Sequence, residues 1–227
     1  MISALTPGFL LGMPLVGAVI AIAAALYSYE SANESGSAPA HSNLSPGRLI
    51  VFLILPVFLV MLSLPLWMLV QGKARYDIES SIVEAAAMAY GVPSLLAGIG
   101  MAIVMAKGIG KAIQDGKLFA RVLVYVVRPL TPALFGLVIF FMILGLIPSV
   151  PPGFIPSPIS GTEDVPAWNA AFYISIGGIA APLTAILSAF PNRAWEPRGM
   201  GRAVVLGAIG ESVCIVFLVL AFFAVNA

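Results

Sequence analysis

The sequence predicts an all-α membrane protein with six transmembrane helices. Of its 227 residues, 60% are hydrophobic and only 9% are charged, a composition far outside that of soluble domains. Six apolar stretches are also long enough, at about 1.5 Å of helical rise per residue, to cross a hydrocarbon core about 30 Å thick. We therefore expect an integral, multi-pass membrane protein that contacts the lipid bilayer. The six stretches are residues 8–29, 49–70, 85–110, 122–147, 170–190 and 202–223.

The same composition excludes several classes of function. The net charge of +1 and the lack of a basic stripe argue against a nucleic-acid partner. A single cysteine, Cys214, allows no internal disulfide, and a single histidine, His41, allows no cluster of histidine metal ligands. No phosphate-binding loop or nucleophile triad is present. We therefore expect no metal, no cofactor and no enzyme activity in the chain by itself.

The first two stretches form the first predicted unit, residues 1–75. No lysine or arginine precedes Arg48, so we expect the first stretch to be a retained helix and not a cleaved signal peptide. Residues 30–47 are rich in serine, asparagine, glycine and proline and are typical of a loop. We expect Pro56 and Pro65 to kink the second helix.

The other four stretches alternate in character. The third and fifth are crowded with glycine and alanine, which allow close helix packing in lipid, whereas the fourth and sixth are rich in bulkier side chains. The fourth and sixth match when Arg121 is aligned with Arg202. We therefore predict two fused helical hairpins, residues 76–150 and 151–227, each made of a small-residue helix, a basic loop and a bulky helix. The matched pairs are Leu134 with Ile215, Leu137 with Leu218, Val138 with Val219 and Phe141 with Phe222.

Loop charges predict the topology. The loops at residues 107–121 and 191–202 carry surplus lysine and arginine and are expected in the cytoplasm, whereas the loop at 148–168 has neither and is expected outside. Six spans then place both termini on the non-cytoplasmic side. Lys73 and Arg75 fall on the outer side in this arrangement, which runs against the rule.

Glu211 is the only carboxylate in the sixth stretch and lies near its middle. It follows Arg202 by about 13 Å of helix, which is close to the bilayer midplane. A charge there costs several kcal/mol, so the carboxyl either holds a proton or faces a cation or dipole. We interpret Glu211 as an ion-carrying group; the alternative is a protonated side chain that holds a neighbouring helix. We interpret Arg128, about 10 Å deep on the fourth helix, as an interface anchor, with a counter-charge to Glu211 as the alternative.

Sequence motifs in the last four helices carry a family resemblance. They are AGIGMAIVMAKGIG at residues 97–110, RPLTPALFGLV at 128–138 and GAIGESVCIVFLV at 207–219, together with the ending FAVNA. They resemble the proteolipid (c or K) subunit of V-type and archaeal A-type rotary ATPases. The resemblance covers residues 82–227, and the first two helices have no counterpart in the usual four-helix form. It implies a rotor subunit in which Glu211 loads and releases one ion at each passage of the stator.

The resemblance also implies the partners and the ion. The partners are further copies in a homo-oligomeric ring, a stator membrane subunit of the a or I type, and central-stalk subunits. Thr131 aligns with Ser212 in the repeat, and Leu130 occupies the place of Glu211, so only the second hairpin keeps the acid. Pro132 stands where sodium-translocating relatives carry a glutamine ligand, which leaves Thr131, Ser212 and backbone carbonyls freed by Pro129 and Pro132 as the candidate partners of Glu211 and favours protons over sodium. The alternative function is a non-rotary transporter or a structural membrane subunit in which Glu211 packs or binds a solute.

Overall fold

The computed structural model describes residues 5–34, 46–73, 80–115, 118–147, 164–189 and 200–226. All the regular secondary structure in these ranges is helical, so the predicted all-α class is confirmed. Six helical stretches in them are long and apolar enough to cross a membrane, and the protein is therefore an integral, multi-pass membrane protein. The six are Leu5–Glu34, Gly47–Gly72, Ser81–Ala112, Phe119–Gly145, Val165–Ala189 and Ala203–Val225.

Some of these spans are divided into shorter elements. The first comprises α1 (Leu5–Pro7), a π-helical turn η1 (Gly8–Gly12) and α2 (Met13–Glu34). The second is α3 (Pro46–Lys73) and the third is α4 (Ser80–Gln114). The fourth comprises α5 (Phe119–Val127) and α6 (Leu130–Gly145), the fifth comprises α7 (Asp164–Gly178) and α8 (Ala180–Ala189), and the sixth is α9 (Met200–Val225).

Several helices extend beyond their predicted ends. α2 continues to Glu34 and α3 begins at Pro46, both inside the segment predicted as a loop at residues 30–47. α4 continues to Gln114, inside the basic segment predicted as a loop at 107–121, and α7 begins at Asp164, inside the one predicted at 148–168. Hydropathy marks only the part of a helix that lies in the apolar layer, whereas the backbone hydrogen bonds continue into the polar interface. Most residues of the predicted loops, including the bases between α8 and α9, lie outside the described part of the chain.

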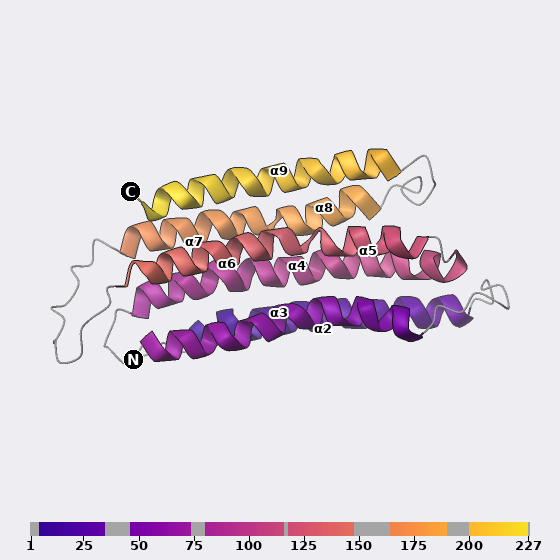
Figure 1. Ribbon diagram of the computed structural model, residues 1–227, viewed down its shortest axis with the longest axis horizontal. Coiled ribbons are helices and arrows are strands. Elements are labelled where there is room, and N and C mark those ends of the chain that lie inside the picture. Colours follow the sequence, from indigo (N-terminus) through magenta and orange to yellow (C-terminus); the bar gives the residue numbers. More distant parts are fainter. Residues whose placement is uncertain are drawn as a thin grey trace.

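The helices lie side by side along one long axis, with α4 in the middle (Figure 1). α4 contacts α2 on one side and α5, α6, α7 and α8 on the others, and 67% of its membrane-spanning window is buried. α9 forms the side of the molecule opposite α2 and α3, and only 22% of its window is buried. The chain starts and finishes at the same end of the bundle, as an even number of spans requires (Figure 1). Which side of the membrane that end faces stays a prediction.

The first helix of each hairpin packs on the first helix of the next. α2 contacts α4, and α4 contacts α7 and α8, whereas α3, α5, α6 and α9 lie beside this row as the second helices of their hairpins. The α2–α3 hairpin, for which the sequence suggested no counterpart, thus extends the row formed by the other two. The predicted unit boundaries between residues 75 and 76 and between 150 and 151 fall between the hairpins and stay a prediction.

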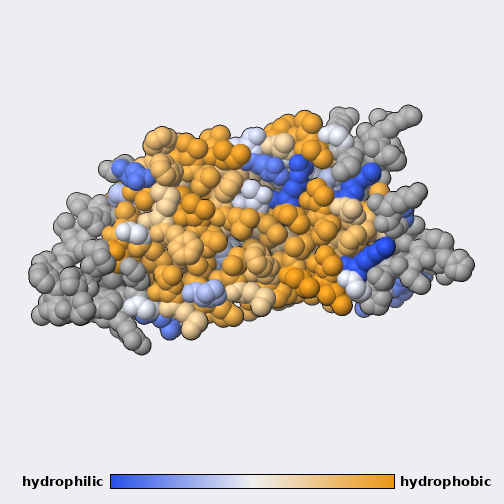
Figure 2. All heavy atoms as spheres, viewed as in Figure 1, coloured by the Kyte–Doolittle hydropathy of each residue, from blue (hydrophilic) through white to orange (hydrophobic). Residues whose placement is uncertain are grey.

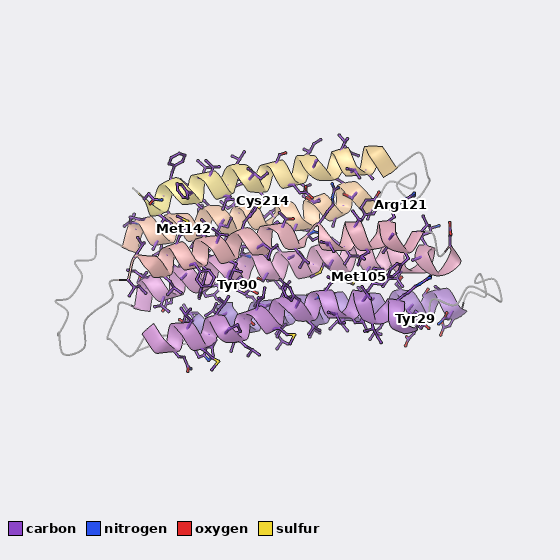
Figure 3. The ribbon with its side chains drawn as sticks, in the orientation of Figure 1. Tyr29, Tyr90, Met105, Arg121, Met142 and Cys214 are labelled. Atoms are coloured by element: carbon purple, nitrogen blue, oxygen red, sulfur yellow. The ribbon has the colours of Figure 1, made fainter. Side chains whose placement is uncertain are left out.

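Small residues bring α2 and α4 into backbone contact. A Cβ atom added at Gly98 on α4 would overlap the backbone of Gly17 on α2. Nearby, Tyr90 lies where α4 faces α3 (Figure 3), and its hydroxyl donates a hydrogen bond to the Leu59 carbonyl at 2.7 Å. The glycine-rich third stretch therefore packs closely against its neighbours, as its composition predicted.

Prolines break two of the spans at the same level. α5 and α6 are separated at Pro129, and α7 and α8 separate just before Pro182, whereas α3 continues through both of its prolines. A Cβ atom added at Gly100 on α4 would lie 2.8 Å from Pro129 Cβ and 3.0 Å from the Ala181 carbonyl carbon, so both breaks face the same point on α4. The core consists of two clusters of buried apolar side chains, one toward each end of the bundle.

The surface matches a membrane protein, with one interruption. Figure 2 shows apolar residues over the middle of the molecule and hydrophilic residues near its two ends. A smaller hydrophilic patch interrupts the apolar surface between α8 and α9 (Figure 2). Polar groups at this depth have no bulk water to bind, so they need partners inside the protein.

Candidate ion-binding site

Glu211 lies near the middle of α9 and forms an ion pair with Arg128. Arg128 Nε is 3.3 Å from Glu211 Oε1, and the side chains are 14% and 28% exposed respectively. Arg128 belongs to the turn that separates α5 from α6. The helix break therefore lies at the depth of the acid, and the site joins the end of α5 to the middle of α9.

The interpretation of Arg128 as an interface anchor is wrong, and the alternative, a counter-charge to Glu211, is confirmed. The energetic reason is the depth of both groups. A guanidinium and a carboxylate in contact each offset the cost of the other's charge, which two separate charges in the same layer could not do. The sequence repeat gave no warning of this pairing, because Arg128 aligns with the apolar residue Ile209 in the second hairpin.

The rest of the guanidinium is held against α8 and α9. Nη2 donates a hydrogen bond to the Val204 carbonyl at 3.2 Å. Nη1 is buried and has no hydrogen-bond partner, and the same holds for the hydroxyl of Ser188 on α8. A Cβ atom added at Gly207 would collide with Nη1 and lie 2.6 Å from Ser188 Oγ. Gly207 therefore provides the space into which the Arg128 head fits, and two unsatisfied polar atoms border that space.

A second glycine brings α8 against the residue before the acid. A Cβ atom added at Gly210 would collide with Thr184 Oγ1 and lie 3.2 Å from Thr184 Cα. Thr184 and Ser188 are 2% and 1% exposed. The sequence analysis missed both hydroxyls and Gly207. The available signal was two hydroxyls four residues apart in an apolar stretch, which places them on one face of a helix.

The two predicted partners of Glu211 are Ser212, the next residue on α9, and Thr131, three residues after Arg128. The Ser212 hydroxyl donates to the Ala208 carbonyl of its own helix at 2.8 Å. Thr131 is half-buried, and its backbone N–H donates to the Arg128 carbonyl at 3.1 Å. That carbonyl lost its usual helical donor because Pro132 has no N–H. The roles of Thr131 and Ser212 in ion binding stay a prediction.

Within the described residues, the other ionisable groups near the pair come mainly from α5, where Tyr125 lies within reach of the charges of Arg121 and Arg128. α6 and α8 contain no charged residue, and α7 carries Asp164 only at its first position. Cys214 is a free, buried thiol one turn beyond Glu211, near the middle of α9 (Figure 3). Within the described ranges, no three His, Cys, Asp or Glu side chains come together as a metal site. The chemistry available here is therefore one carboxyl, one guanidinium and a few hydroxyls.

Comparisons with known proteins agree with the motifs. Residues 85–143, which run from α4 into α6, match the family model of the ATP synthase C subunit. Over 141 residues the chain is 31% identical to the A-type ATP synthase subunit K of Methanocaldococcus jannaschii, a match that covers 60% of this chain and 59% of the relative. The chain thus spans about three fifths of the curated relative that it matches. No solved structure matches the chain significantly. The predicted resemblance is confirmed by these matches: the chain is similar to the c and K proteolipids of ATP synthases.

Proposed function

We propose that the protein is a membrane rotor (c-ring) subunit of a V/A-type ATPase or ATP synthase and carries protons across the membrane by reversible protonation of Glu211. The observation that supports this best is a carboxyl at mid-helix on α9, the least buried span, in a chain similar to an ATP synthase subunit K. Acids inside membranes usually mark ion pathways.

The position of Glu211 on its helix suits such a carrier. Gly207, Gly210 and Cys214 on α9 are buried, whereas Ser212 and Val213 are exposed, so Glu211 lies at the border between the packed and lipid-accessible faces. A carboxyl at this border is stable in lipid when it holds a proton, and it loses that proton where water or a cation stabilises the charge.

The surroundings favour a proton over sodium. Sodium needs several oxygen ligands, and a guanidinium in contact with the carboxylate repels a metal cation. Among the described residues, the Ser212 hydroxyl bonds to the Ala208 carbonyl and the Arg128 guanidinium contacts the Glu211 carboxylate, which argues against sodium at this site.

The assembly follows from the same proposal. Copies of the chain form a homo-oligomeric ring, a stator membrane subunit of the a or I type meets α9, and central-stalk subunits contact the loops at the other end of the hairpins from the termini. The chain needs no cofactor, and ATP is made or hydrolysed by other subunits of the complex.

The test is loss of the acid. We expect Glu211→Gln to abolish ATP-driven proton uptake into membrane vesicles that contain the assembled complex. Because this change leaves the Arg128 charge unpaired, the double variant Arg128→Gln/Glu211→Gln is measured beside it. Glu84→Gln, near the beginning of α4, is the matched control and keeps proton uptake. Continued proton uptake by an assembled variant without Glu211 would remove this residue from the mechanism.

A second candidate function is favoured by the ion pair itself. A structural membrane subunit, or a non-rotary transporter, could use Glu211 to hold the turn between α5 and α6 against α9. The two functions differ in the assembled double variant: a packing role predicts normal proton uptake once both charges are removed, whereas a carrier role predicts none. Oligomeric state separates them further, because a rotor forms a closed ring of many copies.

A further inference from the structure

The guanidinium of Arg128 contacts other groups besides the Glu211 carboxylate. Nε faces Glu211 Oε1 at 3.3 Å and Nη2 donates to the Val204 carbonyl at 3.2 Å. Nη1 has no hydrogen-bond partner, although it borders the same space at Gly207 as the unpartnered Ser188 hydroxyl, which is 1% exposed. A strong donor and a buried acceptor thus border one space without being satisfied, which is costly unless they pair in another conformation.

We propose that Arg128 is an intrachain counter-ion that keeps Glu211 charged and closed to protons until the guanidinium shifts to Ser188 and the Val204 carbonyl. This inference rests on the proposed role of Glu211 as a proton carrier. An arginine keeps its charge under all ordinary conditions, so a proton can bind the carboxylate only in place of the guanidinium. The two states then differ by one short side-chain movement.

The local structure allows that movement. Arg128 lies in the turn between α5 and α6, where its backbone N–H donates to the Val124 carbonyl at 3.4 Å and its carbonyl accepts from the Thr131 N–H at 3.1 Å, so the movement involves the side chain alone. Gly207 leaves room for the guanidinium on the α9 side, and α8 presents the Ser188 hydroxyl to that room. Among the described residues, α6 and α8 contribute no charged group, α9 adds the Cys214 thiol, and the charges of both Arg128 and Arg121 on α5 act on Tyr125. In the shifted state, Nη1 donates a hydrogen bond to the Ser188 hydroxyl, while Nη2 keeps its hydrogen bond to the Val204 carbonyl.

The test is the rate at which dicyclohexylcarbodiimide labels Glu211, read by mass spectrometry in membranes that contain the assembled complex. Carbodiimides react with the neutral carboxyl, so we expect slow labelling of the unmodified chain. Arg128→Gln should label about tenfold faster or more, since an opposite charge in contact changes the balance between charged and neutral carboxyl by at least about that factor. Arg128→Lys restores the charge and should return the rate close to its starting value, which a purely structural role of the guanidinium would not do.

Equal labelling rates in the unmodified chain and Arg128→Gln overturn the inference, as does an absence of labelling in both. The proposed function is judged separately by proton uptake: if Arg128→Gln labels faster while assembled variants without Glu211 still pump, only the carrier role fails.

Discussion

At the scale of the residue, the two members of the central ion pair are not equivalent. Glu211 can become neutral by taking up a proton, whereas Arg128 has no such route. The two variants that break the pair therefore leave different problems behind. Removing Arg128 leaves a group that can shed its charge, and removing Glu211 leaves a fixed positive charge beside the Val204 carbonyl in the membrane interior.

A double-mutant cycle makes this asymmetry measurable. We expect Glu211→Gln to lower the free energy of unfolding by about 3–5 kcal/mol, the usual cost of leaving one charge of a buried ion pair without its partner. Arg128→Gln should lower it by less. The double variant should recover most of the loss, because two neutral amides replace the two charges. Unfolding of purified protein in mixed detergent micelles gives the three values. Equal losses in the single variants, or additive losses in the double variant, would contradict the pairing.

The sequence identified the acid and left its partner open. Glu211 could be identified from the sequence alone, because it is a single carboxylate in an apolar stretch. Its pairing with Arg128 depends on the turn between α5 and α6 and on the space at Gly207, and both are consequences of packing between helices that are far apart in the chain. Depth along the helices placed Arg128 about 10 Å and Glu211 about 13 Å deep, and it left open whether the two side chains face each other.

At the scale of the element, proline and glycine act as a pair on neighbouring helices. Pro93 in α4 has no N–H, so the Ala89 carbonyl loses its helical donor. Gly136 on α6 lies directly over that carbonyl, and a Cβ atom added there would collide with it and lie 3.2 Å from Pro93 Cγ. A Cβ atom added at Gly178 on α7 would lie 3.1 Å from Pro93 Cα. The proline thus packs against glycines of two neighbouring helices.

Substituting one of these glycines should be costly. We expect Gly136→Ala to lower the free energy of unfolding by about 1–3 kcal/mol, because the methyl group must push α6 away from α4. The control is Gly145→Ala at the end of the same helix, where the added Cβ has no neighbour within 4 Å. Thermal inactivation in detergent compares the two. A variant at position 136 that is as stable as the control would show that α6 does not approach α4 so closely.

At the scale of the whole molecule, hydropathy and the repeat predicted the spans, but not the arrangement of the first two helices. The row of small-residue helices follows from the glycine-rich third and fifth stretches, which the sequence displays. α2 joins this row through Gly17, which packs against Gly98 of α4. Gly17 does not stand out in its own stretch of the sequence, so its role could not be predicted without the packing partner. The α2–α3 hairpin is therefore part of the packed body and not a separate attachment.

A disulfide between α2 and α4 tests this arrangement. A Cβ atom added at Gly110 would lie 3.8 Å from Ala32 Cβ, the mean separation in a disulfide. In a Cys214→Ala background, we expect Ala32→Cys/Gly110→Cys to form a bridge under mild oxidation, whereas Gly72→Cys/Gly110→Cys should not, because an added Cβ at Gly72 has no neighbour within 4 Å.

Cleavage at a protease site inserted between α2 and α3 then reveals which chains are joined. If α2 packs on its own α4, the N-terminal fragment stays with the same chain until reduction and no dimer forms. A disulfide-linked dimer would mean that α2 reaches the α4 of a neighbouring copy, so that the hairpin would link subunits. Absence of any bridge would contradict the contact itself. Only the intrachain product is consistent with α2 and α3 as a fixed part of each subunit. A ring of such subunits would then include α2 and α3 among the helices that form it.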